Sequence, residues 1–168
     1  MEEKLNEKNI YLDKNGYNEY LKSIEELYDK LKENSKLKTS SYDSAVGDGW
    51  HDNFDFEEAK RKEVSLVMQI NNKNEELKNI IIIENNNNDN SVVNINDVVE
   101  LKFIFDDNEF EKFKLTGGCN PKEHDDYREI TLNSPIGKAI YKQKLGSIVE
   151  YSVLSKKFKV QILRKVIK

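Results

Sequence analysis

Cysteine is almost absent from this chain of 168 residues, since Cys119 is the only one. A single cysteine excludes an intrachain disulfide framework and fits a reducing compartment. No second cysteine and no nearby histidine motif accompanies it, so nothing in the sequence favours zinc binding or nucleophilic catalysis there. We interpret Cys119 as a packing residue.

Long apolar runs are missing as well. The one marked run, Ile80–Ile83, is far too short to cross a bilayer. The N-terminal residues MEEKLNEKN lack the apolar segment of a secretory signal. We therefore expect a cytoplasmic protein that does not bind membranes.

Charge is plentiful but uneven. Charged residues make up 35% of the chain and the formal net charge is −4, yet residues 138–168 hold nine Lys or Arg and one acid, Glu150. Lysine on an exposed sheet edge prevents edge-to-edge pairing. A basic surface also attracts anionic partners. Both readings of the basic C-terminal stretch remain open.

Two stretches have helical periodicity. Apolar residues recur at steps of three and four over residues 17–31, and Asp13 is placed to cap that helix. A second stripe covers residues 56–80, with charged Glu63 and Lys73 among its members. Two helices joined by a short glycine-containing link predict an antiparallel coiled-coil hairpin over residues 1–84.

An Asn-rich linker is predicted over residues 85–90, and after it the pattern becomes strand-like. Residues 97–105 and 110–115 read as a β-hairpin, 127–132 as a strand, and 148–154 with 158–166 as a final hairpin. Ser134 and Pro135 are typical of a helix start. Residues 91–168 are thus expected to form a small antiparallel sheet with one short helix, giving an α+β fold overall.

Three segments resemble the Gre-type bacterial transcript cleavage factors, the GreA/GreB family. They are YLDKNGYNEYLKSIEELYDKL at the first helix, GDGWHDNFDFEEAKRKE at the hairpin tip, and ITLNSPIGKAIYKQKLGSIVEY with its Ser-Pro-aliphatic-Gly element. They span most of the chain in the family's order. The resemblance implies a coiled-coil hairpin and a domain with an FKBP-like fold that docks on polymerase.

The same resemblance implies a role in transcription. The hairpin tip, residues 47–53, enters the secondary channel of bacterial RNA polymerase and stimulates that enzyme's own cleavage of backtracked RNA. The factor is then not an enzyme by itself, and it meets the RNA 3′ end and DNA only within the elongation complex. We expect a monomer.

Asp48 and Asp52 are the candidate catalytic and metal-binding residues implied by this family. Phosphodiester hydrolysis uses paired divalent cations, and Mg²⁺ is often held by only one or two carboxylates with waters. We expect Mg²⁺ held mainly by the polymerase and none bound tightly to the free protein. The family tip has Asp, then Glu three residues later, then Asn, whereas here the two acids are four apart before Asn53.

Other readings of the tip stay open. Asp52 or Asn53 is also suited to cap the second helix, and we assign Asp55, with Glu58, to capping. Trp50 is interpreted as a partner contact and His51 as a polar contact at the tip. Beyond these, Lys60 and Arg61 either touch RNA or pair with neighbouring acids.

Two alternative functions remain at this stage. The chain occupies the channel as a regulator or inhibitor, because the altered tip does not hold metal productively. Alternatively, its C-terminal half is an FKBP-like binding or isomerase module tethered by the coiled coil. The second alternative needs a pocket lined by aromatic residues, and core packing is the better reading of those that alternate along the strands, Phe103, Phe105, Phe110, Phe113 and Tyr127.

Overall fold

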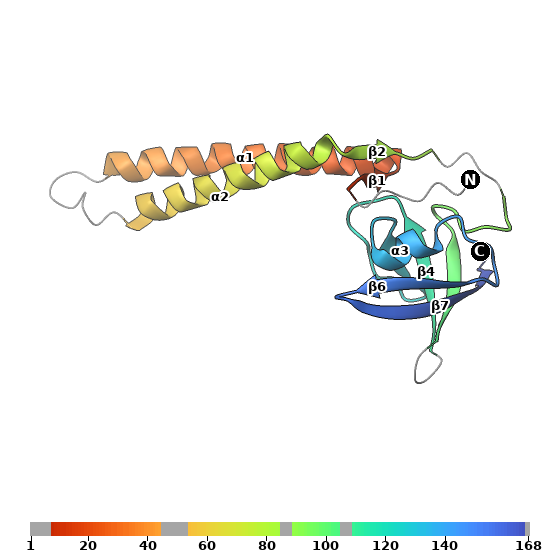
Figure 1. The fold of residues 1–168 in the computed structure, drawn as a ribbon. Coiled ribbons are helices and arrows are strands. Elements are labelled where there is room, and N and C mark those ends of the chain that lie inside the picture. Colours follow the sequence, from red (N-terminus) through yellow and green to blue (C-terminus); the bar gives the residue numbers. More distant parts are fainter. Residues whose placement is uncertain (1–7, 45–53, 85–88, 105–108, 167–168) are drawn as a thin grey trace. The chain divides into compact units, whose positions relative to one another are not determined.

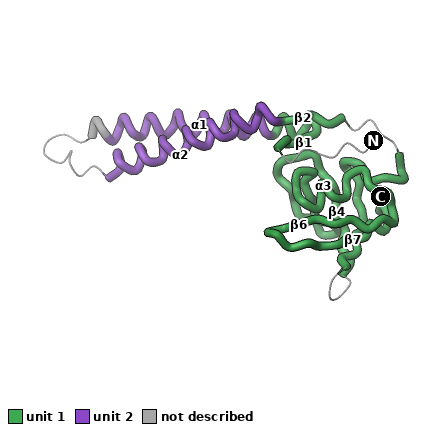
Figure 2. The backbone as a smooth tube through the Cα atoms, viewed as in Figure 1, with its two compact units in different colours: residues 1–19, 80–168 green, residues 20–79 purple. Residues whose placement is uncertain are grey.

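The computed structural model describes residues 8–44, 54–84, 89–104 and 109–166, with the side chains of 42–44 excepted. The chain forms two compact units (Figure 2). Residues 20–79 make the hairpin unit, and residues 1–19 with 80–168 make the sheet unit. The sequence had placed residues 1–84 together, whereas the described residues before Tyr20 and after Asn79 pack with the sheet.

The hairpin unit consists of α1, Lys14–Ser44, and α2, Phe54–Leu77. The helices run antiparallel (Figure 1), since the Tyr20 hydroxyl donates to Glu76 and the Asn34 amide donates to Ala59. Leu27, Leu66 and Ile70 form the apolar centre, with Leu31 packed against it. The predicted stripes are therefore confirmed as the contact between the two helices.

The beginning of α1 is fixed inside the sheet unit. The Gly16 N–H donates to the Asp13 carboxylate at 2.7 Å, which confirms Asp13 as the N-cap. Glycine at position 16 allows the helix to touch the backbone of Gly117, because an added Cβ would lie 2.2 Å from the Gly117 carbonyl oxygen. Cys119 lies two residues after Gly117, and its Sγ is 3.6 Å from the Gly16 carbonyl oxygen.

Two short strands that the sequence did not predict flank the helical hairpin along the chain. β1, Ile10–Leu12, pairs in parallel with β2, Ile80–Ile82. The stripe was expected to continue as helix to Ile80, but α2 ends at Leu77 and the isoleucines enter a strand. Asn133 secures β1 through two bonds to the Tyr11 backbone, at 2.8 and 2.9 Å.

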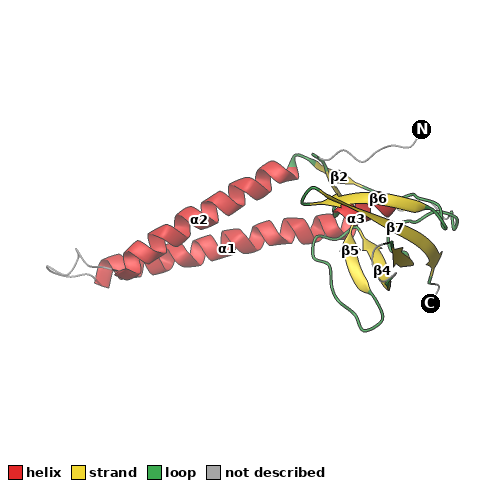
Figure 3. Ribbon diagram, turned by 60° about the horizontal axis from the view of Figure 1, so that its bottom comes forward, coloured by secondary structure: helices red, strands yellow, loops and turns green. Residues whose placement is uncertain are grey.

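The main sheet has five strands in the order β5-β4-β3-β7-β6, and Figure 3 draws strands in yellow. The strands are β3, Val98–Phe103; β4, Phe110–Thr116; β5, Arg128–Thr131; β6, Ile148–Val153; and β7, Lys156–Lys165. Both predicted β-hairpins form, as β3–β4 and β6–β7. β5 was expected in an antiparallel sheet but pairs in parallel with β4, because residues 117–127 carry the chain back before it pairs again.

The short helix α3, Pro135–Ile140, forms as predicted. The Ser134 hydroxyl accepts the Gly137 N–H at 3.0 Å, and proline occupies the first turn. Ile140 is fully buried and Ile136 packs against the core. The rest of the core is drawn from the strands and their flanks, chiefly Val93, Ile95, Val99, Leu101, Leu115, Leu132, Val160 and Ile162. None of the helices among the described residues is both long and apolar enough to span a membrane.

Glu129 joins β5 to the loop before it. Its carboxylate accepts the Lys122 N–H at 3.2 Å and lies 3.3 Å from both the Lys114 ammonium and His124 Nε2. Burial alone would raise the pKa of Glu129, but the bonds from Lys122, Lys114 and His124 outweigh it and hold the pKa below its usual value of 4.5.

Glu129→Gln is expected to remove an acid-sensitive part of the stability. A carboxyl whose pKa is lower in the folded state stabilises that state above its unfolded pKa and loses this effect as the pH falls through the folded value. The stability difference between wild type and E129Q should be full at neutral pH and shrink below pH 4.5. Urea unfolding from pH 7 to 3 measures it, with exposed Glu123→Gln as control. A difference that persists at the lowest pH would contradict the assignment.

Candidate functional site

The candidate site lies where the two helices meet their connecting segment. α1 ends at Ser44 and α2 begins at Phe54, and antiparallel pairing puts these two helix ends at the same end of the hairpin (Figure 1). The tip candidates lie outside the described residues: Asp48, Trp50, His51, Asp52 and Asn53. Their assignments stay predictions.

The start of α2 corrects one assignment. Asp55 was predicted to cap this helix, but the helix begins at Phe54 and includes Asp55 in its first turn, together with Glu57. An acid there interacts favourably with the helix dipole without serving as the cap. The capping role of Asp55 is therefore wrong.

Asn34 fixes the pairing of the helices toward the tip. Its side chain is only 2% exposed, and its amide donates to the Ala59 carbonyl across the hairpin at 2.7 Å. A buried asparagine in a coiled coil specifies register, because any slip leaves its polar atoms unpaired. Asn34 continues the spacing of Leu27 and Leu31, so the helical period itself pointed to it although sequence reasoning did not select it.

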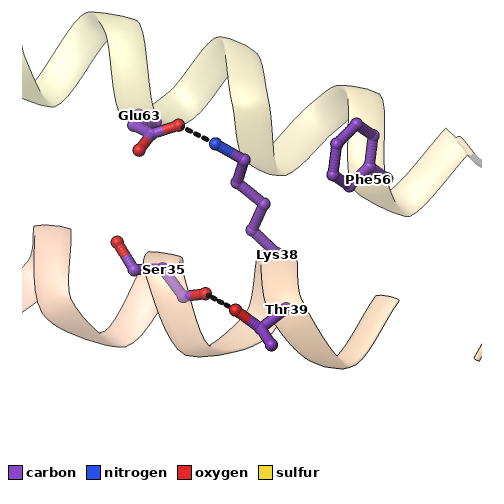
Figure 4. A pocket seen from close by; sticks show the side chains of 5 residues that line it. All are labelled: Ser35, Lys38, Thr39, Phe56 and Glu63. Atoms are coloured by element: carbon purple, nitrogen blue, oxygen red, sulfur yellow. Dashed lines mark hydrogen bonds and ion pairs between the residues drawn. The ribbon is translucent and has the colours of Figure 1, made fainter. Parts of the chain in front are cut away.

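The two charged members of the second stripe both find partners on α1. Glu63 accepts from the Lys38 ammonium at 2.5 Å, with each side chain about one-third exposed (Figure 4). At the other end, the Lys73 ammonium lies 4.4 Å from the centroid of the Tyr20 ring. The charged positions therefore belong to the helix pairing rather than interrupting it.

A shallow groove of about 290 Å³ opens beside the Lys38–Glu63 pair. Figure 4 shows Ser35, Lys38 and Thr39 of α1 facing Phe56 and Glu63 of α2. The Thr39 hydroxyl is already engaged, since it donates to the Ser35 carbonyl at 3.0 Å. The groove is thus a gap between the two helices near the end of their pairing, with side chains that serve that pairing.

Asn34→Ala is expected to destabilise the hairpin by about 1 kcal/mol, because it removes a buried hydrogen bond. Ser35→Ala is the matched control, since Ser35 neighbours it on α1 but is exposed. Urea unfolding followed by circular dichroism compares the two variants. Equal midpoints for both would show that the Asn34–Ala59 bond does not secure the register.

Lys60 and Arg61 are exposed on α2, behind the tip segment. Sequence reasoning allowed them to pair with nearby acids. Within the described part of the chain neither one forms an ion pair, and Glu63 pairs with Lys38 instead. Pairing of Lys60 or Arg61 with a described acid is therefore not observed.

The described residues contain no cluster of three or more His, Cys, Asp or Glu side chains suited to a metal ion. The predicted Mg²⁺ contact involves only Asp48 and Asp52, which lie outside these residues.

Comparisons with known proteins agree with the architecture. Residues 88–164 match the family model described as "Transcription elongation factor, GreA/GreB, C-term". The chain is 28% identical, over 164 residues, to transcription elongation factor GreA of Thermosipho africanus, covering 95% of this chain and 97% of that protein. Residues 88–164 are thus those of a Gre-type factor. The predicted family and its α+β fold are thereby confirmed.

This Gre-type factor is also similar to solved structures. The GreA factor homolog 1 (Gfh1) of Thermus thermophilus matches with a TM-score of 0.41 and 20% identity, covering 94% of this chain and 99% of that one. A GreA/GreB factor from Nitrosomonas europaea matches with a TM-score of 0.37 and 20% identity, covering 64% and 93%.

Proposed function

We propose that this Gre-type factor is a transcription elongation factor that stimulates cleavage of backtracked RNA by bacterial RNA polymerase. The tip of the helical hairpin, residues 47–53, enters the secondary channel of the polymerase. The observation that supports the proposal most is the antiparallel pairing of α1 and α2, with Asn34 bonded to Ala59 at 2.7 Å. This pairing brings together the two helix ends that carry the Asp48–Asp52 segment.

Asp48 and Asp52 supply carboxylates to a Mg²⁺ in the polymerase active centre. Oxygen ligands suit this ion, and it is usually bound by one or two carboxylates while it keeps several waters. The ion activates water or stabilises the leaving oxygen, as in two-metal phosphodiester cleavage. The factor completes a site in another enzyme and does not catalyse cleavage alone.

The basic residues behind the tip fit the same role. Lys60 and Arg61 are exposed and available to RNA phosphates, because cationic side chains neutralise backbone charge. The sheet unit, whose residues 88–164 match the GreA/GreB C-terminal model, provides the docking domain on the polymerase.

An isomerase role is the weaker alternative. Phe103 and Phe113 pack edge to face in the core, with ring centroids 6.0 Å apart. Phe110 is exposed. These three described aromatic residues therefore serve the core or the surface and do not line one common pocket.

A transcript-cleavage assay tests the proposal. Elongation complexes of the cognate polymerase, halted and backtracked, are incubated with and without the factor, and shortened RNA is quantified. Faster cleavage with the factor is the expected result. A factor that binds the polymerase but never speeds cleavage, at any Mg²⁺ concentration, would instead be a channel-binding regulator.

A further inference from the structure

The β6–β7 hairpin runs beyond the rest of the sheet (Figure 1). β3 pairs with β7 only from Val160 to Lys165, whereas β6 stays paired with β7 as far as Val153 and Lys156. The last bond from the β3 side joins the Ile104 N–H to the Lys159 carbonyl at 3.0 Å. Residues 151–158 therefore form a two-stranded extension, here called the arm.

One side of the arm carries two aromatic residues and the other side is polar. Tyr151 and Phe158 are cross-strand partners and their rings stack with centroids 5.5 Å apart. Val153 lies two residues along β6 on the same side and is 41% exposed. On the opposite side, Ser152 is paired with Lys157. Tyr151 is itself packed against the core, and Val153 is paired with exposed Lys156. The aromatic side of the arm is therefore apolar near the sheet and mixed near the turn.

The turn of the arm carries an exposed leucine in an unfavourable conformation. Leu154 and Ser155 have φ angles of 47° and 66°, and Leu154 is 93% exposed. Two-residue turns with positive φ favour Gly, Asn or Asp, and a bulky side chain there is an outlier. Folding is thus better served by another residue at position 154. Local strain of this kind is typical of sites kept for function.

We infer that the arm binds a protein surface that has an apolar pocket with an acidic rim, and that Leu154 enters the pocket. Lys156 and Lys157 are exposed beside Leu154 and complement acidic groups. A leucine side chain has no aromatic face on which a nucleobase could stack, so Leu154 suits a protein pocket better than a nucleic acid. Two basic arms repel each other, which disfavours arm-to-arm pairing of two copies.

The inference rests on the proposed function in one respect, since it takes the pocketed surface to belong to RNA polymerase. Its site is separate from the hairpin tip, because residues 151–158 lie in the sheet unit. The arm therefore contributes affinity, whereas Asp48 and Asp52 contribute to cleavage. A variant of the arm should therefore lose affinity and keep cleavage at saturation, whereas a variant of Asp48 or Asp52 should lose cleavage and keep affinity.

The test compares Leu154→Asn with Ser155→Asn. Both positions have positive φ, so asparagine relieves backbone strain at either one, but only the first change removes the apolar side chain. Binding of labelled factor to cognate core polymerase without nucleic acid is followed by fluorescence anisotropy. We expect L154N to raise Kd about tenfold or more, which corresponds to about 1.4 kcal/mol of lost binding free energy. S155N should change Kd by less than about twofold, and neither substitution should lower Tm.

Charge reversal provides a second variant. Lys156→Glu combined with Lys157→Glu should weaken binding and reduce its dependence on salt. At saturating concentration L154N should stimulate cleavage as wild type does, since only docking is impaired.

Several results would overturn the inference. L154N that binds core polymerase as tightly as wild type would remove the role of the arm while leaving the proposed function intact. An affinity loss confined to complexes that carry DNA and RNA would assign the arm to nucleic acid. A wild-type dimer in sedimentation that L154N dissociates would assign it to a second copy. A wild-type protein that does not bind polymerase at all would overturn both the proposed function and the role of the arm.

Discussion

Asp48→Asn and Asp52→Asn should each remove most of the cleavage stimulation, at least about tenfold, and leave polymerase affinity nearly unchanged. The reason is that each change removes a negative charge from the Mg²⁺ contact while keeping side-chain size and capping ability. The double variant should be little worse than either single one, because the two carboxylates act as a unit. Rates of RNA shortening and binding curves measured on the same complexes check both expectations.

Asp55→Asn is the matched control. Asp55 lies in the first turn of α2 and is exposed, so the same chemical change close to the tip should leave stimulation intact. Raising Mg²⁺ should partly restore D48N and D52N, since mass action refills a weakened site. Full stimulation by the double variant would exclude the metal role of the pair.

Gly16→Ala should destabilise the sheet unit by about 2 kcal/mol, the range of overpacking in a tight interior. In an ordinary helix this change adds up to about 1 kcal/mol of stability. Here the new Cβ would lie 2.2 Å from the Gly117 carbonyl oxygen. Gly117 cannot move away easily, because it is itself packed closely against Asp13. The steric cost therefore exceeds the gain in helix propensity.

Asn15→Ala serves as the comparison for Gly16→Ala. Asn15 is exposed in the same turn of α1, so its replacement gains helix propensity without a clash and should leave the protein slightly more stable. Urea unfolding of the two variants measures the contrast. Two equally stable variants would mean that the α1 start does not rest on the Gly117 backbone.

The sequence was sufficient for elements that carry their own local signals. Ser134 with Pro135, and Asp13 before α1, were recognised as helix starts because capping chemistry is local. The β3–β4 and β6–β7 hairpins followed from alternation on both sides of a turn. The direction of β5 did not, since alternation of apolar residues is the same in parallel and antiparallel strands.

Long-range contacts explain the remaining differences. The strands β1 and β2 have three residues each, too few for a period, and they exist because residues 70 positions apart in the chain pair with each other. Gly16 looked costly within a helix until its contact with Gly117 was visible. At the candidate site, residue types and the family resemblance suggested Asp48 and Asp52. Asn34 keeps the helical period, but its role became visible only through its bond to Ala59 across the hairpin.

The parallel pairing of β1 with β2 has a consequence for how Gre-type chains can be varied. Residues 13–79 begin directly after Leu12 and end directly before Ile80, and the flanking strands are hydrogen-bonded neighbours, with the Ile83 N–H also donating to the Leu12 carbonyl at 2.8 Å. In topological terms, the helical hairpin is an insertion between two strands that are already paired with each other. Such a segment can be lengthened or shortened beyond its first turn without a new connection, provided that Asp13 and Gly16 keep their contacts with Gly117. This makes the two strands natural junctions for chimaeras.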